Sequence, residues 1–193
     1  MGFYALKDNF DEGFTTAYWN NKNITNYTCE VCEGINSENN GPLVISFDGK
    51  GDMADYYRIV KWHTISPKLM QVLVDNKITG IRFKDILIDD EKGNLLTTDL
   101  KQLDVYGRSG LLTDLNGDEI PNCPVCHRVT PENLEGQKGL SINLDKWDKW
   151  DGSDMFNYDN WEGNIIVTEK VKEIIERNNI TNIYFVNIHS YDL

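Results

Sequence analysis

The chain has few of the features that mark the common enzyme and membrane classes. It contains four cysteines, three histidines and five prolines in 193 residues. It has no Gly-Lys-Ser/Thr phosphate loop, no Gly-x-Ser-x-Gly and no His-Glu-x-x-His. No apolar run approaches the roughly 18 residues of a membrane span, and no basic stretch leads into an apolar one at the start. We therefore expect a cytoplasmic protein that does not contact a membrane and is not an enzyme.

Positive charge is also scarce. The chain has 19 Lys and Arg residues against 31 Asp and Glu residues, a net charge of −12. A surface of this sign repels phosphate backbones, so we expect no nucleic-acid partner. It would complement a basic protein partner, although an acidic surface can also serve solubility alone.

All four cysteines occur in two Cys-x-x-Cys pairs: Cys29 with Cys32, and Cys123 with Cys126. Each pair is typical of a zinc knuckle, and two knuckles supply the four sulfurs of a closed structural zinc site. The sequence predicts knuckles at 27–34 and 121–128, joined by one zinc ion across an intervening loop of 90 residues. A thioredoxin-like redox role for one pair is the alternative.

A helix-turn-strand pattern occurs twice, at 64–88 and 166–190, and a constant offset of 102 positions aligns the copies without gaps. Ser66 and Thr168 are expected N-caps, with Pro67 in the first helical turn. Asn76 and Asn178 should end the helices in the left-handed conformation. We interpret the two segments as equivalent αβ units.

These patterns predict a single α+β domain over residues 1–193. Two similar helix-strand units would pack on mixed or antiparallel sheets, with a four-cysteine zinc-knuckle element that is similar to a zinc ribbon. Further strands are predicted from apolar and β-branched composition at 43–47, 57–60, 86–88 and 164–167.

The segment around 147–156 combines aromatic and acidic side chains. Its candidate partner-binding residues are Trp147, Trp150, Asp151, Asp154 and Phe156. Tryptophans concentrate binding energy in interfaces, and the carboxylates would suit a basic partner. The alternative is that these aromatic residues cover the sheet or the knuckles.

Taken together, the two Cys-x-x-Cys knuckles, the Trp-Asp-Gly-Ser-Asp-Met-Phe segment at 150–156 and the closing helix from Val167 resemble the double-CXXCG motif proteins. These are bacterial immunity proteins that accompany polymorphic toxins. Glu33 and His127 stand where that family has glycine, the residue that most easily forms the tight turn after the second cysteine. The resemblance implies a non-enzymatic inhibitor that binds a cognate toxin in the cytoplasm of the producing cell.

Two other classes remain open from the residues alone. One is a zinc-ribbon accessory protein that binds nucleic acid or a transcription component. The other is a thiol- or metal-dependent enzyme, which would require an open coordination position on the metal. The sequence does not predict an oligomeric state.

Overall fold

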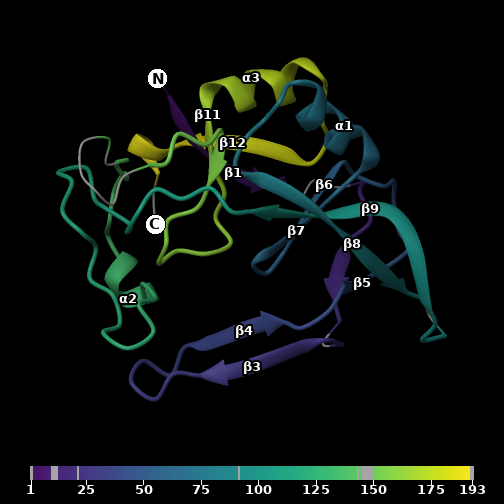
Figure 1. Ribbon diagram of the computed structural model, residues 1–193, viewed down its shortest axis with the longest axis horizontal. Helices are drawn as coiled ribbons and strands as arrows, with labels where there is room; N and C mark the ends of the chain where they lie inside the picture. The colour runs from purple at the N-terminus through teal and green to yellow at the C-terminus, as the bar shows by residue number, and fades with distance from the viewer. Residues whose placement is uncertain are drawn as a thin grey trace.

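The computed structural model describes residues 2–9, 13–20, 22–90, 92–142, 144 and 150–191, and it combines helices with mixed and antiparallel sheets (Figure 1). One sheet has the order β10 (Met155–Phe156), β11 (Ile166–Thr168), β1 (Phe3–Asp8), β12 (Ile183–Asn187). A second has the order β2 (Ala17–Trp19), β5 (Leu43–Phe47), β8 (Ile81–Asp89), β9 (Leu95–Val105), β7 (Trp62–Ile65), β6 (Tyr56–Ile59). The third is a ribbon of β3 (Ile24–Thr28) and β4 (Ile35–Asn39). The helices are α1 (Pro67–Asp75), α2 (Pro131–Leu134), α3 (Glu169–Arg177) and the 3₁₀ turn η1 (Ile188–Ser190).

Part of the six-stranded sheet has the same strand order as the four-stranded sheet. The series β6-β7-β9-β8 corresponds to β10-β11-β1-β12. In each series an antiparallel strand pair leads into a helix, and the strand after the helix pairs with a further antiparallel strand. That last strand is β9, next along the chain, in the first series, whereas in the second it is β1 from the N-terminal end. A segment distant in sequence therefore completes the second sheet.

The two longer helices end in the same way. Asn76 and Asn178 both have φ −91° and ψ 7°, and each side-chain amide donates 2.8 Å to the carbonyl four residues earlier. The prediction of a left-handed asparagine is wrong by one residue, because Lys77 and Asn179 carry the positive φ, 51° and 50°. The asparagines act instead through their side chains, which satisfy carbonyl groups at the helix end.

Helices α1 and α3 pack into a common core. It contains Leu69 and Leu73 of α1, Val171 and Ile175 of α3, and Leu6 of β1, each 2% exposed or less. Full burial of one such side chain contributes about 1.5–3 kcal/mol, so this shared core holds the two larger sheets together.

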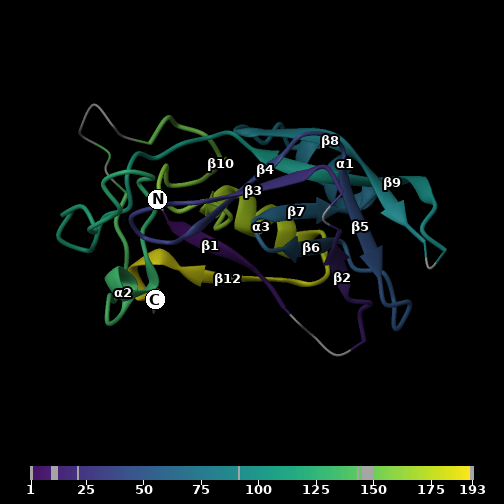
Figure 2. The ribbon, with the colours of Figure 1, turned by 90° about the horizontal axis from the view of Figure 1, so that it is seen from below.

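The β3–β4 ribbon lies on the opposite side of the molecule from α1 and α3 in Figure 1, and it crosses the same region as the helices when seen from below in Figure 2. Its side chains are mostly exposed or half-buried. A two-stranded hairpin alone is marginally stable in water, so the ribbon needs an anchor at its tip.

Several sequence predictions coincide with these elements. Strand 43–47 is β5, while 57–60, 86–88 and 164–167 overlap β6, β8 and β11. No helix among the described residues is long and apolar enough to cross a lipid bilayer.

Candidate metal centre

The first knuckle is the turn that joins β3 to β4. The Cys29 N–H donates to the Gly34 carbonyl at 3.0 Å, and the Glu33 N–H donates to the Cys29 carbonyl at 2.9 Å. These two bonds fold the turn so that Cys29 and Cys32 lie on one side of it. The ribbon therefore presents two sulfurs at its tip.

The second knuckle, in the loop before α2, repeats this geometry. The Cys123 N–H donates to the Arg128 carbonyl and the His127 N–H to the Cys123 carbonyl, both at 2.9 Å. Each partner lies 94 residues after its counterpart, as Cys123 does after Cys29. The two knuckles are thus the same backbone structure formed twice.

The residue after each second cysteine takes a backbone conformation that favours glycine. Glu33 has φ 55° and His127 has φ 57°, in the left-handed region. A non-glycine residue there costs about 1–2 kcal/mol. The turn keeps its shape in spite of this cost, although neither position holds the glycine of the double-CXXCG motif.

The four sulfurs converge, all within 4.8 Å of one another. The Cys29 and Cys123 sulfurs are 3.8 Å apart, and those of Cys32 and Cys126 are 3.5 Å apart. A tetrahedral ion with metal–sulfur bonds of about 2.3 Å separates its ligands by about 3.8 Å. These separations are too long for disulfides. The four cysteines therefore form a site that could hold a metal ion.

The surroundings of the cluster favour thiolate at one member of each knuckle. Backbone N–H groups of Cys32 and Val31 lower the pKa of Cys29 to about 6. The N–H groups of Cys126 and Val125 likewise lower the pKa of Cys123. Thiolate is the form that binds metal.

The pKa of Cys32 is shifted in the opposite direction, upward. The Gly34 N–H lowers its pKa, but burial and the hydrogen bonds with the other three thiols together outweigh that donor and raise it to about 11. Four thiolates at this separation repel one another strongly. A cation among them would remove that repulsion, which is the electrostatic case for a metal.

Arg128 ties the second knuckle to the ribbon. Its Nη2 donates to the Ile35 carbonyl and to Asn36 Oδ1. Gly34 lies beneath it, and a Cβ there would be 2.9 Å from Arg128 Nη1 and 3.2 Å from Cys32 Sγ. Sequence reasoning missed Arg128, whose only signal was its place two residues after Cys126.

The predicted partner-binding segment has a different role in the structure. Phe156 is fully buried, so a partner cannot touch it. Trp150 packs edge-on against Phe3 at 5.1 Å, and its indole N–H donates to the Ser153 carbonyl. The Asp154 carboxylate accepts hydrogen bonds within the fold. Trp150 and Phe156 therefore pack within the fold, as the alternative interpretation of the segment expects.

Two further residues were predicted for this contact surface, Asp151 and Trp147. Asp151 is exposed, and its carboxylate accepts the N–H groups of Arg108 and Ser153. Trp147 lies outside the described residues. The structure thus brings together the predicted metal ligands but uses most of the predicted contact residues internally.

One of the three histidines, His63, is fixed in the core. His63 is 5% exposed, and its Nδ1 lies 2.7 Å from the Tyr56 hydroxyl. Burial lowers the pKa of His63 to about 3, so the imidazole is neutral at physiological pH. We assign it a packing role.

Comparison with known proteins adds no relative to this picture. No protein-family model matches the chain, and a search of curated proteins finds no match. The likeness to the double-CXXCG motif proteins therefore depends on the residues quoted above.

Proposed function

We propose that this protein is an immunity protein, a non-enzymatic inhibitor that binds a cognate bacterial toxin in the cytoplasm of the producing cell. The observation that carries the proposal is the pair of matching knuckles, which bring four sulfurs within 4.8 Å of one another. Such a set fills all four positions of a tetrahedral metal. The metal would then be structural, and function would reside in the surface.

Zinc is the ion we propose for this site. Four thiolates form a soft, tetrahedral donor set, which zinc accepts without redox chemistry. Cys29 and Cys32 would hold it from the ribbon, and Cys123 and Cys126 from the second knuckle. Structural zinc contributes on the order of 10 kcal/mol to folding, enough to anchor a ribbon that is marginal alone.

Net charge supports a basic toxin as the partner. The chain carries −12, and opposite charge accelerates association and favours the correct partner. We propose no nucleic-acid partner and leave the oligomeric state open. The complex should weaken as salt is added, because salt screens the attraction between exposed charges.

The test is co-expression of this chain with the protein encoded beside it, followed by affinity purification and measurement of zinc in the same sample. We expect a complex with one zinc per chain. Cys123→Ser should lower both melting temperature and binding, while Glu30→Gln, an exposed change in the first knuckle, should alter neither. An acidic neighbour, or a Cys123→Ser protein that keeps its melting temperature and metal but loses binding, would contradict the proposal.

Two alternatives are separated by simple measurements. A zinc-ribbon nucleic-acid protein would shift DNA or RNA in a gel at physiological salt. A thiol oxidoreductase or metal enzyme would need a reactive thiol or an open metal position, so thiol titration with and without chelator distinguishes it from a structural site.

We also propose that 64–88 and 166–190 are copies of one αβ unit. The gapless offset of 102 positions and the corresponding strand orders support this. Replacing α1 by the sequence of α3 should then leave a chain that unfolds cooperatively. The control is a chimera that carries the unrelated α2 segment in place of α1. If the α3 chimera failed to fold and the control folded equally poorly, the result would count against duplication.

A further inference from the structure

A pocket of about 370 Å³ lies beside the metal centre, between the β4 strand of the ribbon and the segment 159–164. Asn36 and Ser37 of the ribbon and Trp161 of the segment 159–164 contribute to its lining. Cys126 also borders it. Its size is at the lower end of the range for small-molecule sites.

The charged lining is unusual for so acidic a protein. Three cations, Arg58, Lys61 and Arg128, face two carboxylates, Asp159 and Glu162. Glu162 is already paired with Lys61 at 2.9 Å, and Asp159 with Arg108 at 3.7 Å. The two arginines have no carboxylate within ion-pair distance in the part of the chain that the structure describes.

Each guanidinium retains donors for a ligand. Arg58 Nε donates to the Val60 carbonyl at 3.2 Å, and Arg128 uses Nη2 on the ribbon. Because a guanidinium has five N–H groups, most remain available on both side chains. Asp8 also lies near Arg58, and the two line a second pocket together, where burial raises the pKa of the Asp8 carboxyl group.

An independent observation concerns Asn160, which lines the same pocket and is 6% exposed. Its Oδ1 accepts the Leu112 N–H at 2.8 Å. Its Nδ2 is buried and has no hydrogen-bond partner among the described residues. This buried amide is an unsatisfied polar group behind the pocket lining, at a cost of about 1–3 kcal/mol.

We propose that this pocket binds the oxyanion of a small ligand, a carboxylate or a phosphate group, between Arg58 and Arg128. Planar guanidinium groups match both oxyanions with paired hydrogen bonds. The Trp161 ring supplies an apolar surface for the remainder of the ligand. The proposal does not depend on toxin binding, because the site can exist whether or not the protein is an immunity protein.

The test uses the full chain as purified, with its metal. Inorganic phosphate and acetate are titrated separately at constant ionic strength, and ¹H–¹⁵N spectra follow the side-chain signals of Arg58 and Asn160. We expect saturable shifts at millimolar concentration. Saturation by phosphate alone assigns a phosphorylated ligand, and saturation by acetate alone assigns a carboxylate. Absence of saturation with both ions overturns the proposal.

Variants make the result specific to the pocket. Arg58→Gln should weaken binding about tenfold, because it removes charge-assisted hydrogen bonds. Arg82→Gln is the matched control: it removes the same charge outside the pocket lining and should leave affinity unchanged. Equal weakening by both variants would indicate charge screening and would refute the site.

A second variant removes a negative charge from the pocket and tests the proposal even if Arg58→Gln does not fold. The Glu162 side chain is 57% exposed, so Glu162→Gln should be tolerated. It removes a lining carboxylate and releases Lys61, and affinity should rise about threefold. Unchanged or weaker affinity in Glu162→Gln would contradict the proposed electrostatics.

Discussion

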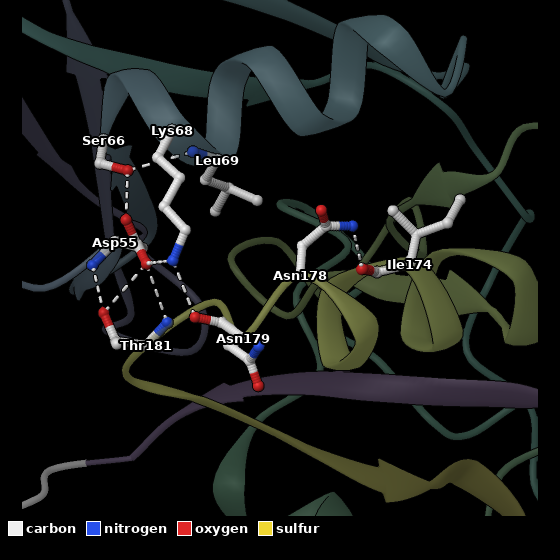
Figure 3. A network of polar contacts seen from close by, with 8 residues as sticks. All are labelled: Asp55, Ser66, Lys68, Leu69, Ile174, Asn178, Asn179 and Thr181. Atoms are coloured by element: carbon white, nitrogen blue, oxygen red, sulfur yellow. Dashed lines mark hydrogen bonds and ion pairs between the residues drawn. The ribbon is translucent and has the colours of Figure 1, made fainter.

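Two αβ units can be compared: β6–β9 with α1, and β10–β12 with α3 and β1. They are joined by two sets of hydrogen bonds, which we call latches, and in each latch an aspartate of one unit accepts from a threonine of the other. Asp55, before β6, accepts the N–H and hydroxyl of Thr181 at 3.0 and 3.2 Å (Figure 3). Asp154, before β10, accepts the same two groups of Thr79 at 3.0 and 3.1 Å. Because each aspartate belongs to one unit and each threonine to the other, the latches join the units rather than stabilise either alone.

The latches are unequal, however. Ser66 donates its hydroxyl to Asp55 at 2.6 Å and accepts the Leu69 N–H, so it serves latch and helix cap together (Figure 3). Its counterpart Thr168 makes no cap bond, and its buried hydroxyl has no partner among the described residues. The two units therefore correspond in strand order without sharing every polar contact.

The glycine at the second latch shows another asymmetry. A Cβ on Gly80 would be 2.1 Å from the Met155 carbonyl. At the corresponding place Asn182 uses its side chain to donate to the Tyr56 carbonyl at 2.7 Å. One unit approaches its neighbour by direct backbone packing, and the other does so through a side-chain hydrogen bond.

We expect the largest loss of stability when a cysteine of either knuckle is replaced. If one metal joins the two knuckles, Cys29→Ser and Cys123→Ser should each lower the free energy of unfolding by several kcal/mol, since either substitution removes one of the four sulfur ligands. The double variant should lose little more than either single one. Urea denaturation with metal analysis measures this. Additive losses, with half the metal retained in each single variant, would show two separate sites.

The next comparison concerns the latch aspartates. Asp55→Ala should cost about 3 kcal/mol and Asp154→Ala about 2 kcal/mol, because Asp55 also accepts the Ser66 hydroxyl. Burial alone would raise the pKa of Asp55, but hydrogen bonds from Ser66, Thr181 and Lys68 outweigh it and hold the pKa below its usual value.

The sign of the pH dependence follows from that lowered pKa. The contribution of Asp55 is fully present above the unfolded-state value of about 3.9 and is lost as pH falls through the lower folded-state pKa. The stability difference between the unmodified chain and Asp55→Ala should therefore be constant from pH 5 to 7 and shrink below about pH 4. Chemical denaturation across this range tests it, and a difference that grew in acid would reverse our assignment.

Sequence reasoning succeeded where the physical signal was local. The Ser66 cap, the apolar helix faces and the Cys-x-x-Cys spacing depend on neighbouring residues, so α1, α3 and the four cysteines could be predicted. It failed for long-range choices: β1 joins strands from the other end of the chain, and nothing in its own sequence indicates that pairing. The aromatic segment near Phe156 has the composition of an interface, but the same composition suits a buried sheet cover.

The third comparison contrasts the two N-caps. Ser66→Ala should cost about 1–2 kcal/mol, because it removes the cap to Leu69 and a donor to Asp55. Thr168→Val has nearly the same shape and removes only an unpaired hydroxyl, so it should be neutral or stabilise by up to about 1 kcal/mol. Thermal unfolding of the two variants checks this, and equal destabilisation would mean that the caps are equivalent after all.

We expect the smallest change in stability from substitutions in the turns of the knuckles. Glu33→Gly and His127→Gly should each stabilise the protein by about 0.5–1 kcal/mol, because glycine accepts the positive φ of 55° and 57° without a Cβ clash. Glu33→Ala is the control: it removes the same side chain but keeps the Cβ, and it should give no gain. If alanine stabilised as much as glycine, the benefit would come from removing an acidic side chain beside four thiolates, and the turns would carry no backbone strain.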